Sequence, residues 1–281
     1  MKLCITFTVI GLLISAAAAQ PATTQPIRVI VRPSPTTAPA VDPETRKILD
    51  AMEAAGKTVK TVRADLSYKA FNTSMGDEQY RTGWVAYQSK QLIKIGEKTI
   101  TKSPMFRVHF DTVKMGKGKT ISRKVDYAYD GKNLTVSKAK NKTITRFQLP
   151  PNSNADDVMQ LGKGPMPIPF GQKTADMVKY FVCTTLPTRI TDPKDTVYLS
   201  LVPRKIHAKD LNTLNIHMWI STKTHLPVKI VTKDKAKDNI TSTFSKTVIN
   251  EVIKKDLFTI PKPLGWKLIV QPMKSGQNIK P

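Results

Sequence analysis

Alternation of apolar and polar residues is the strongest pattern in the chain, and it is clearest in two segments. Residues 62–70 carry an apolar side chain at every even position, and residues 214–220 repeat this arrangement. A period of two places successive side chains on opposite faces of an extended backbone. Both segments are therefore predicted to be half-buried β-strands.

Residues 212–266 form a run of such strands joined by short turns. The strand at 214–220 is followed by a small polar turn and a second strand at 226–230, and a charged turn at 233–239 leads to a third strand from Ile240. Strands connected by short polar turns predict an antiparallel meander.

The same alternation predicts strands upstream, at 79–88, 106–110, 125–129, 134–136, 143–149 and 196–203. Residues 90–104 are harder to assign, with a short strand around Ile93 and a turn at 96–98. A helix is predicted after Asp42, which suits an N-cap, and Gly56 is expected to end it. A second helix is predicted at 174–182.

The number and order of these elements predict the fold class. About ten strands, few helices and no βαβ alternation indicate a mainly β protein. We expect a curved antiparallel sheet, or incomplete β-barrel, with helices covering its concave face.

Two short motifs add a family resemblance. The meander ends in Phe258-x-x-Pro261-x-Pro263-x-Gly265, and the strands at 125–129 and 134–136 are joined by Asp130-Gly131, a strong hairpin signal. In these motifs and in its order of elements, about residues 44–272 of the chain resemble the LolA/LolB-like family of outer-membrane lipoprotein-sorting carriers. The resemblance implies an incomplete barrel that holds lipoprotein acyl chains, with helices and a central loop closing its mouth.

The resemblance also implies a hydrophobic ligand cavity and a lid. The cavity candidates are the strand residues Leu66, Tyr68, Trp84, Val108, Met218, Ile230 and Phe244. The lid candidates are Met166, Ile168 and Phe170, in a Gly- and Pro-rich loop that cannot be regular structure. The same side chains also suit an ordinary core. In that family a lid arginine bonds to backbone carbonyls, and Arg46 and Arg63 are the candidates for this role.

The two ends of the chain predict its organisation. Lys2, a short apolar run and small residues up to Ala19 indicate a signal peptide at 1–19. Gln20 stands where a lipoprotein would carry cysteine, so we expect a soluble protein of the periplasm or the exterior and not a lipoprotein. Residues 20–43 are predicted to be a flexible Pro/Thr-rich linker, 44–272 the LolA-like domain, and 273–281 a flexible tail.

The charge and the cysteine content limit the classes of binding partner that the sequence predicts. The chain has 45 Lys and Arg against 21 Asp and Glu, a net charge of +24, which favours contact with anionic membrane surfaces. Its lysines are scattered singly, so no specific nucleic-acid partner is predicted. After cleavage only Cys183 remains, and we expect it to be a buried residue in a monomer without disulfides.

The motifs of common catalytic and metal sites are missing from the sequence. The four histidines show no metal-ligand spacing, although a site assembled across strands stays open, and no Gly-x-Ser-x-Gly elbow is present. We therefore predict no catalytic residue, no metal and no cofactor. The expected function is a non-enzymatic carrier of lipids or of the acyl chains of lipoproteins. The alternatives are an envelope interaction or sensor module that binds anionic membrane or cell-wall components, and an uncharacterised hydrolase.

Overall fold

The computed structural model describes residues 41–95, 97–149, 158–162 and 168–273. The predicted signal peptide, nearly all of the predicted linker, Met166 and residues 274–281 lie outside these ranges. No helix within them is long and apolar enough to cross a membrane.

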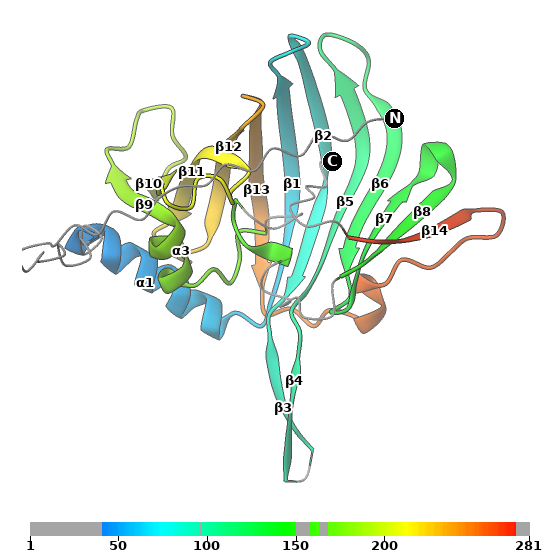
Figure 1. The fold of residues 1–281 in the computed structure, drawn as a ribbon, viewed down its shortest axis with the longest axis horizontal. Coiled ribbons are helices and arrows are strands. Elements are labelled where there is room, and N and C mark those ends of the chain that lie inside the picture. Colours follow the sequence, from blue (N-terminus) through cyan, green and yellow to red (C-terminus); the bar gives the residue numbers. More distant parts are fainter. Residues whose placement is uncertain (1–40, 96, 150–157, 163–167, 274–281) are drawn as a thin grey trace, which may run out of the picture. The chain divides into compact units, whose positions relative to one another are not determined.

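A twelve-stranded sheet forms the body of the protein (Figure 1). Its spatial order is β14-β8-β7-β6-β5-β2-β1-β13-β12-β11-β10-β9. Neighbouring strands are antiparallel except β14 and β8, which are parallel. The bounds are β1 Thr61–Asn72, β2 Asp77–Gln88, β5 Met105–Met115, β6 Ile121–Tyr129, β7 Asn133–Lys138, β8 Thr143–Gln148, β9 Phe181–Leu186, β10 Thr196–Pro203, β11 Thr213–Ser221, β12 Pro227–Asp234, β13 Asn239–Ile249 and β14 Lys267–Pro272.

The predicted fold class is confirmed, since the protein is mainly β and its curved sheet is not closed into a barrel. The twelve-stranded sheet has two strands that were not predicted. Strand β14 was not predicted, and the predicted helix at 174–182 is divided: α3 spans Thr174–Tyr180, and Phe181 begins β9. The β-branched residues that follow, Thr184 and Thr185, favour the extended backbone.

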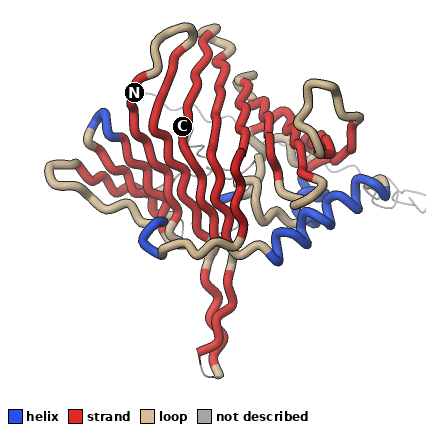
Figure 2. The backbone as a smooth tube through the Cα atoms, turned by 180° about the vertical axis from the view of Figure 1, so that it is seen from behind, coloured by secondary structure: helices blue, strands red, loops and turns tan. Residues whose placement is uncertain are grey.

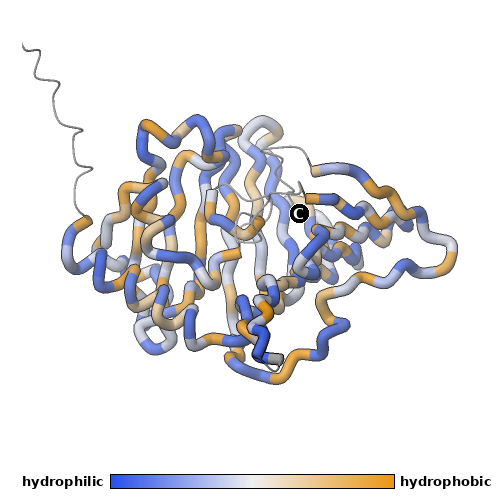
Figure 3. Tube along the Cα trace, turned by 60° about the horizontal axis from the view of Figure 1, so that its bottom comes forward, coloured by the Kyte–Doolittle hydropathy of each residue, from blue (hydrophilic) through white to orange (hydrophobic). Residues whose placement is uncertain are grey.

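The register aligns apolar side chains across one face of the sheet. Leu199, Met218 and Ile230 are consecutive partners on β10, β11 and β12, and Leu66 of β1 faces Phe244 of β13. All five are buried in one hydrophobic cluster. Hydrophobic and hydrophilic residues follow one another closely along the chain (Figure 3), and burial alternates most clearly in β1 and β11. The clustered side is the concave face of the sheet.

Two helices lie over this face at the β9–β13 half (Figures 1 and 2). Helix α1 spans Pro43–Thr58 and α3 spans Thr174–Tyr180. Asp42 accepts hydrogen bonds from the backbone N–H groups of Glu44 and Thr45, which confirms the predicted N-cap. The helix continues past Gly56, so the predicted end was two residues early. Leu49 and Met52 of α1 and Met177 of α3 are buried against the sheet.

A separate two-stranded hairpin projects from the end of the sheet where β2 ends and β5 begins (Figures 1 and 2). It consists of β3 Gln91–Ile95 and β4 Lys98–Lys102. Leu92 is 71% exposed and Ile100 is 46% exposed. We refer to residues 90–102 as the arm.

The opposite, convex face of β5–β8 is partly covered by the segment before β14. This segment contains the 3₁₀ helix η2, Lys255–Phe258, and its Ile260 packs with Ala128 and Ile144. A second 3₁₀ helix, η1, spans Ala139–Asn141 between β7 and β8.

Candidate ligand-binding site

Most of the predicted cavity residues share the concave face. The six that do so are each at most 8% exposed and belong to one cluster: Leu66, Tyr68, Val108, Met218, Ile230 and Phe244. The structure brings them together as the alternation predicts, because residues of equal parity along a strand project to the same side.

Trp84 lies on the other face. It is paired with Asp65 and His109, whereas its neighbour Val85 is buried in the concave cluster. The Trp84 ring stacks on His109 at a centroid distance of 5.3 Å, and the guanidinium groups of Arg63 and Arg107 lie 5.8 and 5.6 Å from it. Tyr87, which was not predicted, takes the aromatic position of β2 on the concave side.

Two of the three predicted lid residues are described, and both are buried. Ile168 is 3% exposed and Phe170 is 2% exposed. The Phe170 ring lies 5.4 Å from Phe244 and 5.8 Å from Tyr87 between centroids. Phe170 therefore packs against the central strands from a segment that has no regular structure.

Gln172 holds this segment in place through backbone groups. Its side-chain N–H groups donate to the carbonyls of Met159, at 3.1 Å, and Ile168, at 2.8 Å, and its amide oxygen accepts from the N–H of Leu161 at 3.4 Å. The Ile168 N–H also donates to the Met159 carbonyl. One amide side chain thus joins residues 158–162 to residues 168–172.

Neither Arg46 nor Arg63, the two candidates for the lid arginine, donates to a backbone carbonyl within the described residues. Arg46 pairs with Asp50 on the exposed side of α1, and Arg63 lies over Trp84 on the convex face. The arginine that bonds to the covering helix is Arg204, whose Nε donates to the Val178 carbonyl at 2.8 Å. Sequence reasoning missed both Gln172 and Arg204, because an isolated polar residue in a loop carries no pattern that reveals its partner.

Glycine allows the loop to approach α1 and the sheet closely. Gly171 has φ +73°, and a Cβ there would lie 2.5 Å from the Tyr87 hydroxyl. A Cβ on Gly56 of α1 would lie 3.3 Å from the Gly171 Cα. A side chain at Gly171 would therefore push the loop away from Tyr87.

Charged side chains connect the two covering helices. Glu53 of α1 accepts a hydrogen bond from the Thr174 N–H at the start of α3, at 2.9 Å, and pairs with Lys57, also at 2.9 Å. The hydrogen bond from Lys57 is the larger cause and that from Thr174 the next, and together they hold the pKa of Glu53 below its usual range. At the other end of α1, Thr45 Oγ1 lies 2.9 Å from Thr185 Oγ1 of β9.

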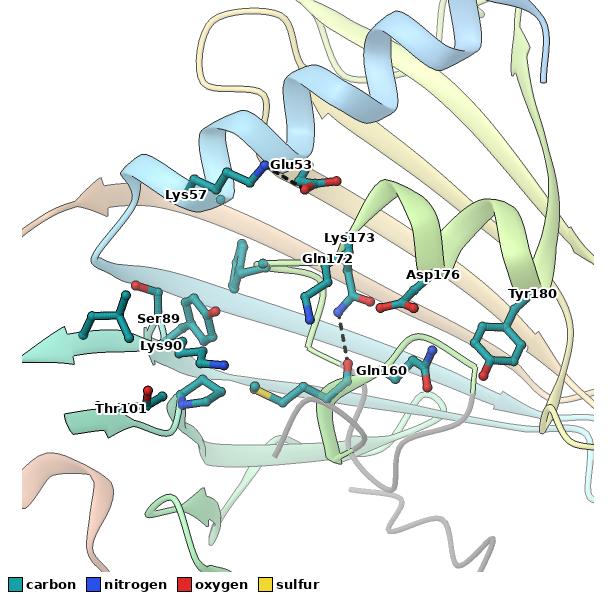
Figure 4. A pocket seen from close by; sticks show the side chains of 17 residues that line it. Glu53, Lys57, Ser89, Lys90, Thr101, Gln160, Gln172, Lys173, Asp176 and Tyr180 are labelled. Atoms are coloured by element: carbon teal, nitrogen blue, oxygen red, sulfur yellow. Dashed lines mark hydrogen bonds and ion pairs between the residues drawn. The ribbon is translucent and has the colours of Figure 1, made fainter. Parts of the chain in front are cut away.

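A pocket opens between α1, α3, the loop and the base of the arm (Figure 4). Its volume is about 610 Å³, within the usual range for small-molecule sites. Tyr87, Met159 and Phe170 contribute apolar lining, and Lys57, Lys90, Lys173, Glu53 and Asp176 contribute charged lining. An apolar floor with a charged, mostly basic rim suits an amphipathic molecule with an anionic end.

The convex face carries a cluster of titratable groups. His109 lies between Asp126, 2.8 Å from Nδ1, and Asp111, 2.9 Å from Nε2. Arg107 also pairs with Asp126, at 2.8 Å. The hydrogen bond to Asp126 raises the pKa of His109 above its usual value, against the opposing effect of burial. Burial alone would raise the pKa of Asp126, but His109 and Arg107 outweigh it and the pKa is lowered.

Within the described ranges no group of three or more His, Cys, Asp or Glu residues is arranged to hold a metal ion. Cys183 is buried, as predicted, and burial raises the pKa of its thiol to about 11. A thiol with so high a pKa is a poor nucleophile at neutral pH.

Comparison with known proteins gives structural likenesses only. No family model matches the chain, and no curated protein matches its sequence. Among solved structures, one similar fold is that of an uncharacterised conserved protein from Thermus thermophilus. The match covers 81% of this chain and 99% of that chain, with 9% identity and a TM-score of 0.45. Lipoprotein LppX from Mycobacterium tuberculosis matches 76% and 100%, with 12% identity and a TM-score of 0.44.

A putative outer membrane lipoprotein-sorting protein domain from Vibrio parahaemolyticus is also matched. The match covers 76% of this chain and 95% of that one, with 10% identity and a TM-score of 0.32. At 9–12% identity these likenesses concern the course of the chain and not its chemistry.

Proposed function

We propose that this protein is a non-enzymatic binding or carrier protein for lipids or for the acyl chains of lipoproteins, acting in the periplasm or outside the cell. The acyl chain lies along the concave face, and the cover formed by α1, α3 and the loop around Phe170 opens to admit it. The predicted cavity residues other than Trp84, which lies on the convex face, and the predicted lid residues are part of this proposal.

One observation carries the proposal: the Phe170 ring belongs to the pocket and to the core at once. It lines the 610 Å³ pocket, and it also contacts Phe244 within the concave cluster. Moving this single side chain aside would connect the pocket with the apolar face of the sheet. A ligand could then extend from the basic rim into the core position that Phe170 occupies.

The contacts that hold the cover in place are consistent with a cover that opens while the sheet stays intact. The loop is held by the bonds of Gln172 and by the burial of Ile168 and Phe170, and α3 is tied to α1 through Glu53 and packs on the sheet through Met177. Individual hydrogen bonds of this kind contribute about 0.5–1.5 kcal/mol each, far less than the pairing of the long strands beneath. Opening at this place therefore leaves the sheet intact.

The test has two parts, of which the first is mass spectrometry of lipid extracted from the purified protein. The second is stopped-flow exchange of a fluorescent fatty acid in Phe170→Ala. Removing a buried Phe costs about 3–5 kcal/mol when it is pure core. We expect a smaller loss for Phe170, together with faster uptake and faster release.

Phe258→Ala is the matched control, because Phe258 is 1% exposed in η2 and outside the concave cluster. It should lower stability without changing the exchange rates. No co-purified lipid and no fatty-acid binding by the wild-type protein would refute the proposal. A full stability loss in Phe170→Ala with unchanged exchange would make Phe170 ordinary core.

A second candidate is the envelope interaction module, and the arm favours it. Leu92 and Ile100 are exposed on the arm, and Lys90, Lys94, Lys98 and Lys102 are exposed around them. Exposed apolar side chains among cations suit the surface of an anionic bilayer. The carrier function and the membrane-contact function are compatible, because Lys90, Leu92 and Thr101 of the arm also line the pocket.

A further inference from the structure

A second cavity, remote from the cover, is lined by four cationic and three neutral residues. It has a volume of about 270 Å³ and lies at β2, β6, β7 and η1. Arg81, Arg123, Lys138 and Lys140 line it, together with Tyr127 and Asn141. No carboxylate lines it, and no ion pair of these four cations is found in the described part of the chain.

Arg81 is the unusual member of this group. It is 7% exposed, and its Nη1 is buried without a hydrogen-bond partner among the described residues. Its Nε donates to the Gln79 side chain at 3.2 Å, and its guanidinium lies 5.6 Å from the Phe110 ring centroid. Burial lowers the pKa of Arg81, and the charge of Arg123 adds to this effect. A buried cation without a counter-charge is costly, and a bound anion would remove that cost.

The register places this cavity on the concave face. Arg81 is the partner of Tyr68 on β1, and Val125 of the cavity is the partner of Lys138 on β7. Tyr68 and Val125 both belong to the concave cluster. Position 81 lies six residues before Tyr87 on β2, so the cationic cavity and the pocket beneath the cover lie toward opposite ends of this strand.

We propose that Arg81, Arg123, Lys138 and Lys140 form a binding site for a phosphate group on the concave face. Guanidinium groups match the geometry of phosphate oxygens through paired N–H donors, and lysine adds charge. The source of the phosphate is either the headgroup of a lipid whose acyl chain lies along the same face or a free phosphate ion. The lipid source rests on the proposed function, and the free-ion source does not.

Isothermal titration of the full chain with three probes separates these sources. The probes are inorganic phosphate, 1-palmitoyl lysophosphatidic acid, and the neutral 1-monopalmitoylglycerol. We expect lysophosphatidic acid to bind most tightly, and Arg123→Gln/Lys138→Gln to weaken it about tenfold or more without affecting the neutral lipid. Inorganic phosphate that binds as tightly as lysophosphatidic acid would establish the free ion as the ligand.

Lys124→Gln is the control for charge, because Lys124 is exposed on the other face of β6. It removes one positive charge, whereas the double variant removes two. It should leave all three affinities unchanged. Arg81→Met should abolish phosphate selectivity and raise the melting temperature, since it removes the uncompensated buried charge. A lower melting temperature with unchanged selectivity would make Arg81 a structural residue and overturn the proposal.

The outcomes also separate this site from the proposed function. Equal affinities for the phosphorylated and neutral lipids in the wild-type protein would overturn the phosphate site while supporting acyl-chain binding. Phosphate binding that depends on Arg123 and Lys138, with no binding of either lipid, would support the site and overturn the carrier function. A loss of logarithmic affinity in Lys124→Gln half as large as that in the double variant would show only long-range attraction and would overturn the site.

Discussion

At the scale of single residues, the pKa values of two histidines on one face of the sheet are shifted in opposite directions. His109 lies between two carboxylates, and both ring nitrogens can donate to them only when the imidazole is protonated. His217 has a hydroxyl partner, Tyr198 at 2.9 Å. Burial lowers the pKa of His217, and the charge of Arg189 adds to the shift. The surroundings therefore favour charged His109 and neutral His217.

The two histidines should make opposite contributions to stability as pH changes. The pKa of His109 is raised on folding, so its contribution is fully present below pH 6.5 and is lost as pH rises through the folded-state pKa. The pKa of His217 is lowered, so its contribution is present above pH 6.5 and is lost as pH falls through the folded-state pKa.

Melting temperatures of wild type, His109→Gln and His217→Gln between about pH 5.5 and 9 measure these contributions. The difference between wild type and His109→Gln should shrink as pH rises, and the difference for His217→Gln should grow. Parallel curves for all three proteins would contradict both assignments.

At this scale, the sequence predicted the face of the sheet correctly where the odd and even positions of a strand differ clearly in polarity. Leu66 and Tyr68 lie on a strand whose polar residues mark the outer side, so their burial follows from the alternation. Trp84 lies on a strand with apolar residues on both sides, and parity could not say which set faces inward. The side was decided by pairing with Asp65 and His109, which are far away in sequence.

At the scale of elements, α1 is the part of the cover attached at both ends. Thr45 meets Thr185 of the edge strand β9, and Glu53 holds the start of α3. The proposed function requires the cover to open, and these two contacts decide whether α1 moves with the loop or stays on the sheet.

A disulfide between α1 and β9 distinguishes these cases. The two hydroxyl oxygens lie 2.9 Å apart, so Thr45→Cys/Thr185→Cys places the thiols within bonding reach. The background carries Cys4→Ser and Cys183→Ala to prevent other disulfides. We expect the oxidised protein to take up a fluorescent fatty acid more slowly, and reduction to restore the rate.

The single variant Thr45→Cys in the same background is the control and should not respond to oxidation. Equal uptake by the oxidised and reduced double variant would show that the ligand enters while α1 stays in place. Opening would then be confined to α3 and the loop.

Elements were predicted where the determining signal is local. The meander, the Asp130-Gly131 hairpin and the N-cap of α1 depend on neighbouring residues, and each is present in the structure. Strand β14 pairs in parallel with β8, which lies more than a hundred residues earlier in the chain, and no local sequence pattern predicts such a pairing. The boundary between α3 and β9 was missed because Phe181 and Val182 continue a helical apolar spacing.

At the scale of the whole molecule, charge and apolar surface meet on the arm. Under the second candidate function, the net charge of +24 attracts the protein to an anionic bilayer over distances set by the salt concentration. Leu92 and Ile100 can make contact only at the surface itself. The two effects can be separated, because salt weakens only the first.

Sedimentation with anionic vesicles at about 0.15 M and about 1 M salt measures both effects, since the Debye length falls from about 8 Å to about 3 Å. Wild-type binding should fall steeply with salt but leave a remainder that Leu92→Ser/Ile100→Ser abolishes. Ile190→Ser/Leu264→Ser is the control, since both side chains are fully exposed outside the arm. Equal binding of the two double variants at high salt would remove the arm from membrane contact.

The dual position of Phe170 implies a minimum ligand length. A ligand that displaces this ring must first compensate for its lost burial, about 1.5–3 kcal/mol, while each buried methylene contributes about 0.8 kcal/mol. The first two to four methylenes, roughly, would therefore bring no net affinity. Across a series of fatty acids, logarithmic affinity should rise with chain length from an offset, and Phe170→Ala should move that offset toward shorter chains with the slope unchanged. The side chain that fills the site in the absence of ligand would thus exclude short fatty acids and select long ones.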